Sequence, residues 1–142
     1  MTEFTMTATV PSSYDETVER VRALLADAGF GVLTEIDIRA TLRAKLDVEV
    51  PPQVILGACR PQLAHRAIEA DPRVAALLPC NVVVAAEAQG TRVDVLDPGV
   101  MSTLSPSPVM AEVAADARER LAGMMDTLRN EYERDNDDEA RS

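Results

Sequence analysis

The sequence predicts an α+β domain with a single mixed or antiparallel sheet of about five strands and helices packed on one face. Apolar segments with strand-like alternation recur along the chain, and segments with helical spacing separate them. Their order, β-α-β-β-α-β-β-α, ends in a hairpin and a helix, which favours an α+β fold over a regularly alternating one. Hydrophobic residues make up 46% of the 142 residues, enough for one core without disulfide bonds.

The first strand and the first helix have clear local signals. Residues 4–10 alternate threonine with apolar residues, which predicts a strand. Ser13 and Glu16 have the spacing of a capping box, so a helix is expected to begin there. Apolar residues then follow at helical spacing until Gly29, which is expected to end the helix in a left-handed conformation.

The middle of the chain predicts two more strands and a second helix. Alternation over residues 32–38 indicates a strand with one apolar face. Residues 40–46 fit either a short helix or an irregular edge. The apolar segment 53–59 indicates a buried strand, and Pro61 is suited to the first turn of the helix that follows. Asp71-Pro72 is expected to end that helix.

The last third predicts a hairpin, a long helix and a tail. Residues 82–84 continue as a fourth strand, Gln89-Gly90 forms the turn, and residues 91–97 form the fifth strand. A connector leads to Pro108, where an amphipathic helix begins and continues to Tyr132. We expect residues 1–132 to form one domain and residues 133–142, which are mostly charged, to form a disordered tail.

Composition excludes several functional classes. A net charge of −10 and an aromatic content of 3% argue against a nucleic-acid-binding surface, which needs basic residues and stacking platforms. Residues 1–10 lack the pattern of a signal peptide, and no apolar run reaches about 18 residues, so no membrane span is expected. Two cysteines are too few for a secreted disulfide framework. We therefore expect an acidic cytoplasmic protein with reduced thiols.

The two cysteines form the strongest candidate site. Cys59 ends a buried strand just before Pro61, so the helix dipole and the neighbouring Arg60 are expected to lower its pKa. Cys80 begins a strand beside Asn81, which offers an amide donor. The simpler interpretation is that both are small core residues. The thiols can meet if the third and fourth strands are antiparallel neighbours, whereas parallel pairing would place them at opposite ends of the sheet.

Other residues give weaker signals. Glu35 and Asp37 are two positions apart in a strand, so they share a face and could hold a hard cation; a solvated strand face is the simpler interpretation. His65 is the only histidine, which rules out a multi-histidine metal site within one chain. Its expected partner is Glu69, four residues further along a helix, as a surface pair. No nucleotide-binding loop is present, and no cofactor is identified.

Three motifs resemble the domain-of-unknown-function 302 family. They are the segments GFGVLTEID at residues 29–37, ILGACRP at 55–61 and LLPCNVVV at 77–84. The resemblance spans residues 7–128 and implies a compact α+β fold, often dimeric, with no established reaction. The family's recurrent motif positions correspond here to Glu35, Asp37, Cys59, Pro61, Cys80, Asn81 and Asp97. Arg60 occupies a position where the family commonly has asparagine, so it adds a positive charge beside Cys59.

Three functional hypotheses follow. The first is a binding or thiol-redox module that holds a small molecule, metal or sulfur species near Cys59, Cys80 and Asn81. The second is an interaction domain without a site, whose uncovered sheet face forms a homodimer. The third is an enzyme in which Cys59 is a nucleophile assisted by a carboxylate such as Asp97 or Glu35.

Overall fold

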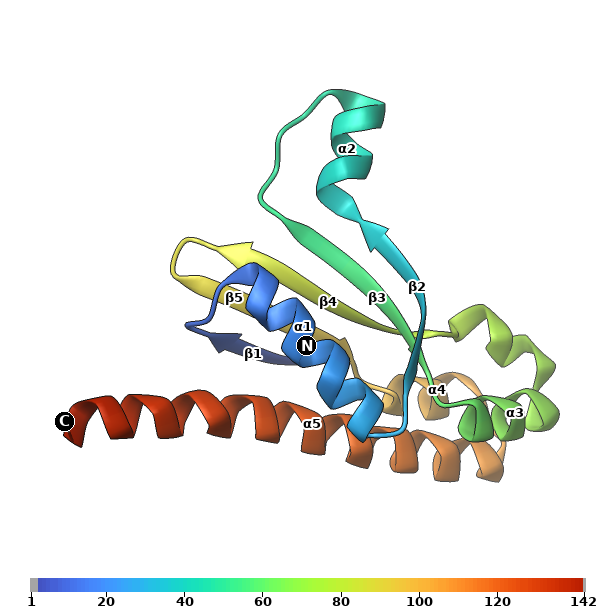
Figure 1. Ribbon diagram of the computed structural model, residues 1–142. Coiled ribbons are helices and arrows are strands. Elements are labelled where there is room, and N and C mark those ends of the chain that lie inside the picture. Colours follow the sequence, from blue (N-terminus) through green and yellow to red (C-terminus); the bar gives the residue numbers. More distant parts are fainter. Residues whose placement is uncertain (1–2, 142) are drawn as a thin grey trace.

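A five-stranded antiparallel sheet organises the molecule, with neighbouring strands in the order β1-β5-β4-β3-β2 (Figure 1). The computed structural model describes the backbone of residues 3–141 and the side chains of residues 3–133. The strands are β1 (Thr5–Val10), β2 (Gly31–Asp37), β3 (Gln53–Cys59), β4 (Cys80–Glu87) and β5 (Gly90–Leu96). The predicted α+β class and the predicted five-stranded sheet are confirmed, and every strand pair is antiparallel.

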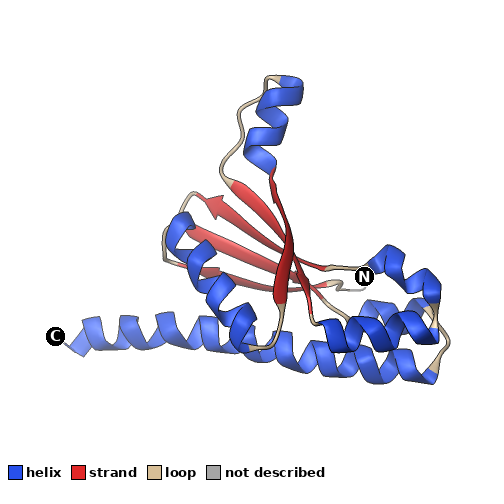
Figure 2. Cartoon of the chain, turned by 45° about the vertical axis from the view of Figure 1, so that its right-hand side comes forward, coloured by secondary structure: helices blue, strands red, loops and turns tan. Residues whose placement is uncertain are grey.

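Five α-helices and one 3₁₀ helix accompany the sheet in the described part of the chain. They are α1 (Tyr14–Asp27), α2 (Ile38–Leu46), α3 (Pro61–Ala70), the 3₁₀ helix η1 (Pro72–Leu77), α4 (Gly99–Leu104) and α5 (Pro108–Arg141). Helices α1 and α5 lie against the sheet, and α3 packs against α5 near the end of β3. Helix α2 projects from the far end of β2 and β3 (Figures 1 and 2). The helical backbone of α5 continues into residues 133–141, and the proposed division between domain and tail stays a prediction.

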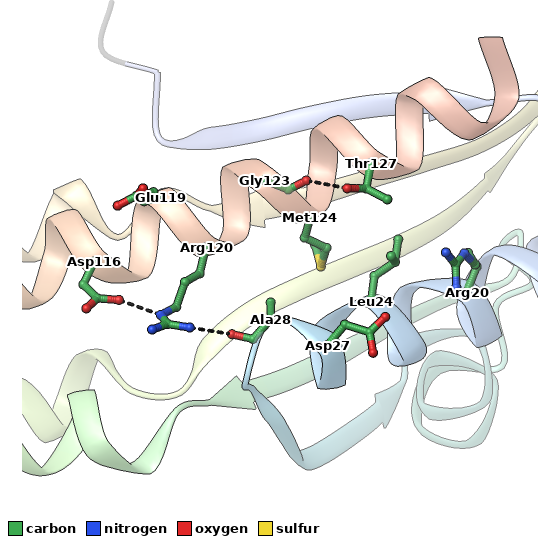
Figure 3. Close-up of a pocket in the computed structure, with 10 residues that line it drawn as sticks. All are labelled: Arg20, Leu24, Asp27, Ala28, Asp116, Glu119, Arg120, Gly123, Met124 and Thr127. Carbon is green, nitrogen blue, oxygen red and sulfur yellow. Dashed lines mark hydrogen bonds and ion pairs between the residues drawn. The ribbon is translucent and has the colours of Figure 1, made fainter. Parts of the chain in front are cut away.

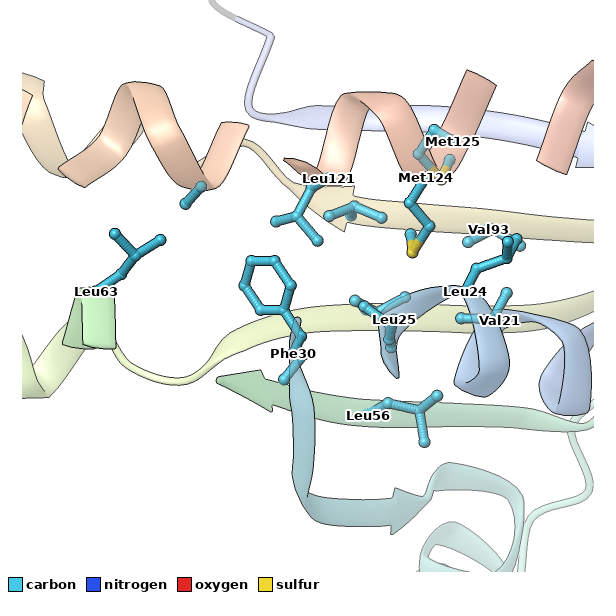
Figure 4. Close-up of a cluster of buried hydrophobic side chains, with 14 of the residues drawn as sticks. Val21, Leu24, Leu25, Phe30, Leu56, Leu63, Val93, Leu121, Met124 and Met125 are labelled. Carbon is cyan, nitrogen blue, oxygen red and sulfur yellow. The ribbon is translucent and has the colours of Figure 1, made fainter. Parts of the chain in front are cut away.

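The core lies between one face of the sheet and the helices. On β3, Val54, Leu56 and Ala58 are buried, as alternation in a strand requires when a single face is covered. Helices α1 and α5 contribute apolar stripes to the same cluster, with Leu25 and Leu121 fully buried (Figure 4). The core is almost wholly aliphatic, so its packing depends on branched side chains and methionines.

The predicted local signals for α1 are largely confirmed. The Ser13 hydroxyl accepts a hydrogen bond from the Glu16 amide at 3.2 Å, which caps the helix. The Glu16 carboxylate accepts a hydrogen bond from the Ser12 hydroxyl at 3.0 Å, whereas a capping box would have it accept from the backbone amide of Ser13. Gly29 adopts φ +88° just after the helix, the left-handed conformation that glycine tolerates best.

The second strand differs from the prediction because its pairing is interrupted. A register shift between Val32 and Thr34 places Val32 opposite the buried Ala58, but Ile36 opposite Ile55 on the other face. The predicted single apolar face of residues 32–38 is therefore wrong, since a bulge moves later side chains across the sheet. Ile38 belongs to α2 rather than to the strand.

Three segments that were not predicted as helices are helical. The ambiguous segment 40–46 lies within α2, where Asp37 caps the helix by accepting from the Ala40 amide at 2.9 Å. Helix η1 lies between the predicted second helix and the predicted fourth strand, and α4 lies in the connector that leads to Pro108. The hairpin turn falls on Ala88-Gln89, one residue before the predicted position, because Gly90 already pairs with Glu87.

Candidate thiol site

Cys59 and Cys80 lie at one end of the sheet, on neighbouring antiparallel strands. Cys80 begins β4 and pairs with Ala58, so Cys59 is the next residue along β3. Antiparallel pairing of β3 and β4 is the alternative of the sequence analysis in which both cysteines lie at the same end of the sheet. Both are free cysteines, and both line one small cavity between the sheet and helices α3, α4 and α5.

The cavity is apolar and very small. It has room for a water-sized sphere over about 20 Å³, which is about the space that one water molecule needs. Apart from the two thiols and Arg60, its lining is apolar. The complete lining is Phe30, Ala58, Cys59, Arg60, Leu63, Ala64, Ala67, Leu78, Cys80, Met101, Val113 and Ala117. Phe30 and Leu63, which form part of this wall, point toward α5 in Figure 4.

Burial controls the ionisation of both thiols. It raises the pKa of the Cys59 thiol, and it raises the pKa of Cys80, with a smaller contribution from the nearby Cys59, to about 11. The expectation that the helix dipole would lower the pKa of Cys59 is thus wrong in direction. Cys59 remains the less buried of the two, since it is partly exposed and Cys80 is only 6% exposed.

Two local features explain why α3 does not favour a thiolate at Cys59. Pro61, its first residue, has no amide hydrogen, so one potential donor is missing from the helix start. Arg60 donates a hydrogen bond to the Gly29 carbonyl oxygen at 3.4 Å, and the guanidinium is directed toward the end of α1. Arg60 therefore lines the cavity, but the hydrogen bond of its guanidinium goes to the backbone of Gly29 and not to the Cys59 sulfur.

Asn81 lies on the opposite face of the sheet from Cys80. It pairs with Gly57 and is exposed, whereas Cys80 pairs with Ala58 and points into the core. Successive side chains of a strand point to opposite faces, so adjacency in sequence separates these two side chains. The predicted grouping of Asn81 with the thiols is not found around the cavity.

The predicted carboxylates are also elsewhere and already have partners. Glu35 forms an ion pair with Arg22 of α1 at 2.7 Å, and Asp37 caps α2. They do share a face, but at the end of β2 away from Cys59, which pairs with Gly31. Asp97 accepts hydrogen bonds from the Gly99 amide at 2.9 Å and from Arg118 at 3.1 Å, which joins the end of β5 to α4 and α5.

His65 and the acidic residues make no metal centre in the described part of the chain. His65 is exposed and lies 2.9 Å from Glu69, the expected surface pair. Among the described residues there is no group of three or more His, Cys, Asp or Glu side chains suited to a metal ion.

The sequence did not identify Met101 as part of the site. It falls in the segment expected to be a connector, yet it lies in α4, is only 4% exposed and lines the thiol cavity. The local signal was weak: Met101 and Leu104 are three residues apart, as on one helix face, but Leu104 is exposed.

A wider groove of about 620 Å³ lies between α1 and α5 (Figure 3). Its arginines are used internally. Arg120 donates to Asp116 at 2.6 Å and to the Ala28 carbonyl at 3.4 Å, and Arg20 pairs with Glu131. The groove lining contains no cysteine or histidine, so the thiol cavity is the stronger candidate site.

The fold and this cavity define a single-sheet α+β domain with two neighbouring thiols at one sheet end. The chain belongs to the DUF302 family, described as a domain of unknown function, whose model matches residues 6–128. It is similar to the crystal structure of an uncharacterized conserved DUF302 protein from Bacillus stearothermophilus. The two chains are 34% identical with a TM-score of 0.80, over 88% of this chain and 98% of the other.

A search of curated proteins found no match to this chain. Within residues 3–141, no helix has both the length and the apolar character needed to cross a bilayer.

Proposed function

We propose that this chain is a thiol-dependent binding domain whose site is the cavity shared by Cys59 and Cys80. The observation that carries the proposal is that both cysteines, from two different strands, line the same cavity. The proposal requires both thiols to stay reduced, as they do in the cytoplasm.

The size and chemistry of the cavity favour a very small ligand. Pockets for organic ligands usually occupy about 300–1,000 Å³, far more than the volume available here. The lining offers sulfur atoms and hydrocarbon, and Arg60 is its one charged residue. A ligand of one or a few atoms that bonds to sulfur fits these conditions better than an organic substrate does.

The geometry gives less support to a cysteine-dependent enzyme. A thiol nucleophile usually needs a base within hydrogen-bonding distance, or a lowered pKa. No residue lining the cavity carries a carboxylate or an imidazole, and burial raises the pKa of both thiols. Binding therefore remains the preferred function over thiolate catalysis.

Alkylation of the native metal-free protein tests the thiol site. Because alkylation consumes the thiolate, we expect iodoacetamide to modify Cys59 first, with a rate that rises with pH, and Cys80 only slowly. Peptide mass spectrometry after timed quenching measures both rates, and urea-unfolded protein supplies the fully accessible control. If Cys80 reacts first, or if both thiols stay inert until unfolding, the two cysteines are core residues and the proposal fails.

A second function, homodimerisation, is favoured by the exposed arm formed by α2. None of its nine residues is buried, although a helix this short is marginal in water without tertiary packing. Leu46 is 66% exposed, and Ile36, where β2 leads into the arm, is 46% exposed. Helix α2 carries three basic residues and no acidic one in a chain of net charge −10. Arg39 and Arg43 pair with Glu49, and the exposed Lys45 suits the acidic body of a second copy.

The face of the sheet away from the helices could contribute to the same contact. An apolar row crosses it from Ile36 through Ile55 to Val83, which are register partners on β2, β3 and β4. We expect light scattering at micromolar concentration to give twice the chain mass of 15.3 kDa. Leu46→Glu should shift the protein toward monomer. A monomeric wild-type protein in both low and high salt would contradict this second function.

A further inference from the structure

Three sulfur-containing residues, not two, line the thiol cavity. Met101 of α4 lines it together with Cys59 and Cys80. The three residues come from β3, β4 and α4, so the tertiary structure brings together sulfur donors that are well separated in sequence. Sulfur ligands, both thiolate and thioether, are soft donors that select soft cations such as Cu(I).

The remaining lining disfavours other metals. Mg²⁺ and Ca²⁺ need several oxygen ligands, and none of the side chains around the cavity carries a carboxylate or amide oxygen. Structural zinc usually takes four ligands drawn from cysteine, histidine and carboxylates, and no group of even three such side chains exists among the described residues. A volume of about 20 Å³ matches one ion rather than a cluster or an organic molecule.

We propose that the cavity binds one soft monovalent cation of the Cu(I) class through the sulfur atoms of Cys59, Cys80 and Met101. This inference rests on the proposed thiol site and names its ligand. Two thiols lose their protons as the cation binds, so 2 RSH + Cu⁺ gives [Cu(SR)₂]⁻ + 2 H⁺, and the thioether adds a neutral third donor. No electron is transferred in this step.

The surroundings suit that product. The two thiolates and the cation together carry one negative charge, and the guanidinium of Arg60 borders the cavity as a single positive charge. Cys59 is partly exposed, whereas Cys80 and Met101 are buried. Because both thiols release a proton as the cation binds, binding should be weaker at low pH and stronger at high pH.

The test is anaerobic titration of the full chain with Cu(I), in competition with a chromophoric Cu(I) chelator, and with Ag(I) as a redox-stable probe. One equivalent should bind. If two protons leave per cation, the binding constant should rise about a hundredfold per pH unit below the thiol pKa values; a single-thiol site would give about tenfold.

Variants assign the three ligands. Cys59→Ala and Cys80→Ala should each weaken binding by at least about a hundredfold, and Met101→Leu, which nearly preserves volume, by at least about tenfold. Met125→Leu is the matched control, because Met125 is also buried in the core but does not line the cavity. Melting curves of the metal-free variants verify that each one folds, and a folded Cys80→Val replaces Cys80→Ala if the alanine variant does not.

The outcomes separate this inference from the function on which it rests. If Cys59 is alkylated in the native protein but Cu(I) neither binds nor protects it, the inference fails and the thiol site stands. Equal Cu(I) affinity in the wild-type and Met101→Leu proteins removes Met101 as a ligand and also overturns the inference. If both thiols are inert in the native state and no cation binds, both proposals fail together.

Discussion

The two ends of the β2–β3 pair differ sharply. At one end, Gly31 pairs with Cys59, and the strands meet α3, α4 and α5 around the thiol cavity. At the other end, Asp37 caps α2, and no residue of that helix is buried. Figure 1 shows the difference directly, with the packed end against α5 and the arm standing away from the sheet.

The comparison shows what each end of the same strands is suited to do. The packed end excludes water, so it can change the ionisation of its thiols and hold a small ligand in fixed geometry. The arm presents exposed apolar and basic side chains, which are suited to contact with another molecule. The candidate chemistry and the candidate interface therefore lie at opposite ends of the same pair of strands.

The largest expected effect is a contrast between two leucine substitutions. Leu56→Ala, at a fully buried position of β3, should lower the free energy of unfolding by about 2–5 kcal/mol because it opens a cavity in the core. Leu46→Ala, on the exposed arm, should change it by less than about 0.5 kcal/mol in dilute monomer. Urea unfolding monitored by circular dichroism measures both. Similar losses for the two variants would show that the arm is packed in solution.

An intermediate effect is expected from alkaline pH at the packed end. The pKa of Cys80 is about 11 in the folded protein against an ordinary value of 9.0, so deprotonation favours the unfolded chain. Stability should be unaffected by this group below about pH 9 and fall as pH rises through about 11, by on the order of 2 kcal/mol.

Cys80→Ala isolates this contribution. The variant should lose the part of the alkaline decline that Cys80 causes, even if its stability at neutral pH is lower. Parallel pH dependences of the unfolding free energy in the wild-type and variant proteins would contradict a buried, protonated Cys80.

The smallest effect is expected from removing residues 133–142. This segment has no large apolar residue, so its deletion should leave the melting temperature almost unchanged. Differential scanning calorimetry compares the full and shortened chains. A decrease of more than about 5 °C would mean that the segment contributes over about 1 kcal/mol, and that the predicted tail is part of the folded domain.

Much of the secondary structure could be predicted because its causes are local. Ser13, Gly29 and Pro61 mark helix boundaries through their own side chains or backbone preferences, and the structure places the boundaries at those residues. The two thiols were also identified from the sequence, and their partnership followed once the pairing of β3 with β4 was known.

Long-range contacts decided the rest. The bulge in β2 depends on its pairing with β3, so the change of face between Val32 and Ile36 has no signal in residues 32–38 themselves. Asn81 was grouped with Cys80 by adjacency, but the strand directs the two side chains to opposite faces. Met101 lines the same cavity as the two cysteines only because α4 packs at the end of the sheet.

The sequence by itself determined the α+β class, the single sheet and the two cysteines that dominate the candidate site, because these depend on periodicity, composition and residue type. Only the tertiary structure decided that the two cysteines and Met101 line one cavity and that the pKa values of the two thiols rise. The physical reason is desolvation: the pKa of Cys59 depends on the side chains that remove water from it, and these come from elements distant in sequence.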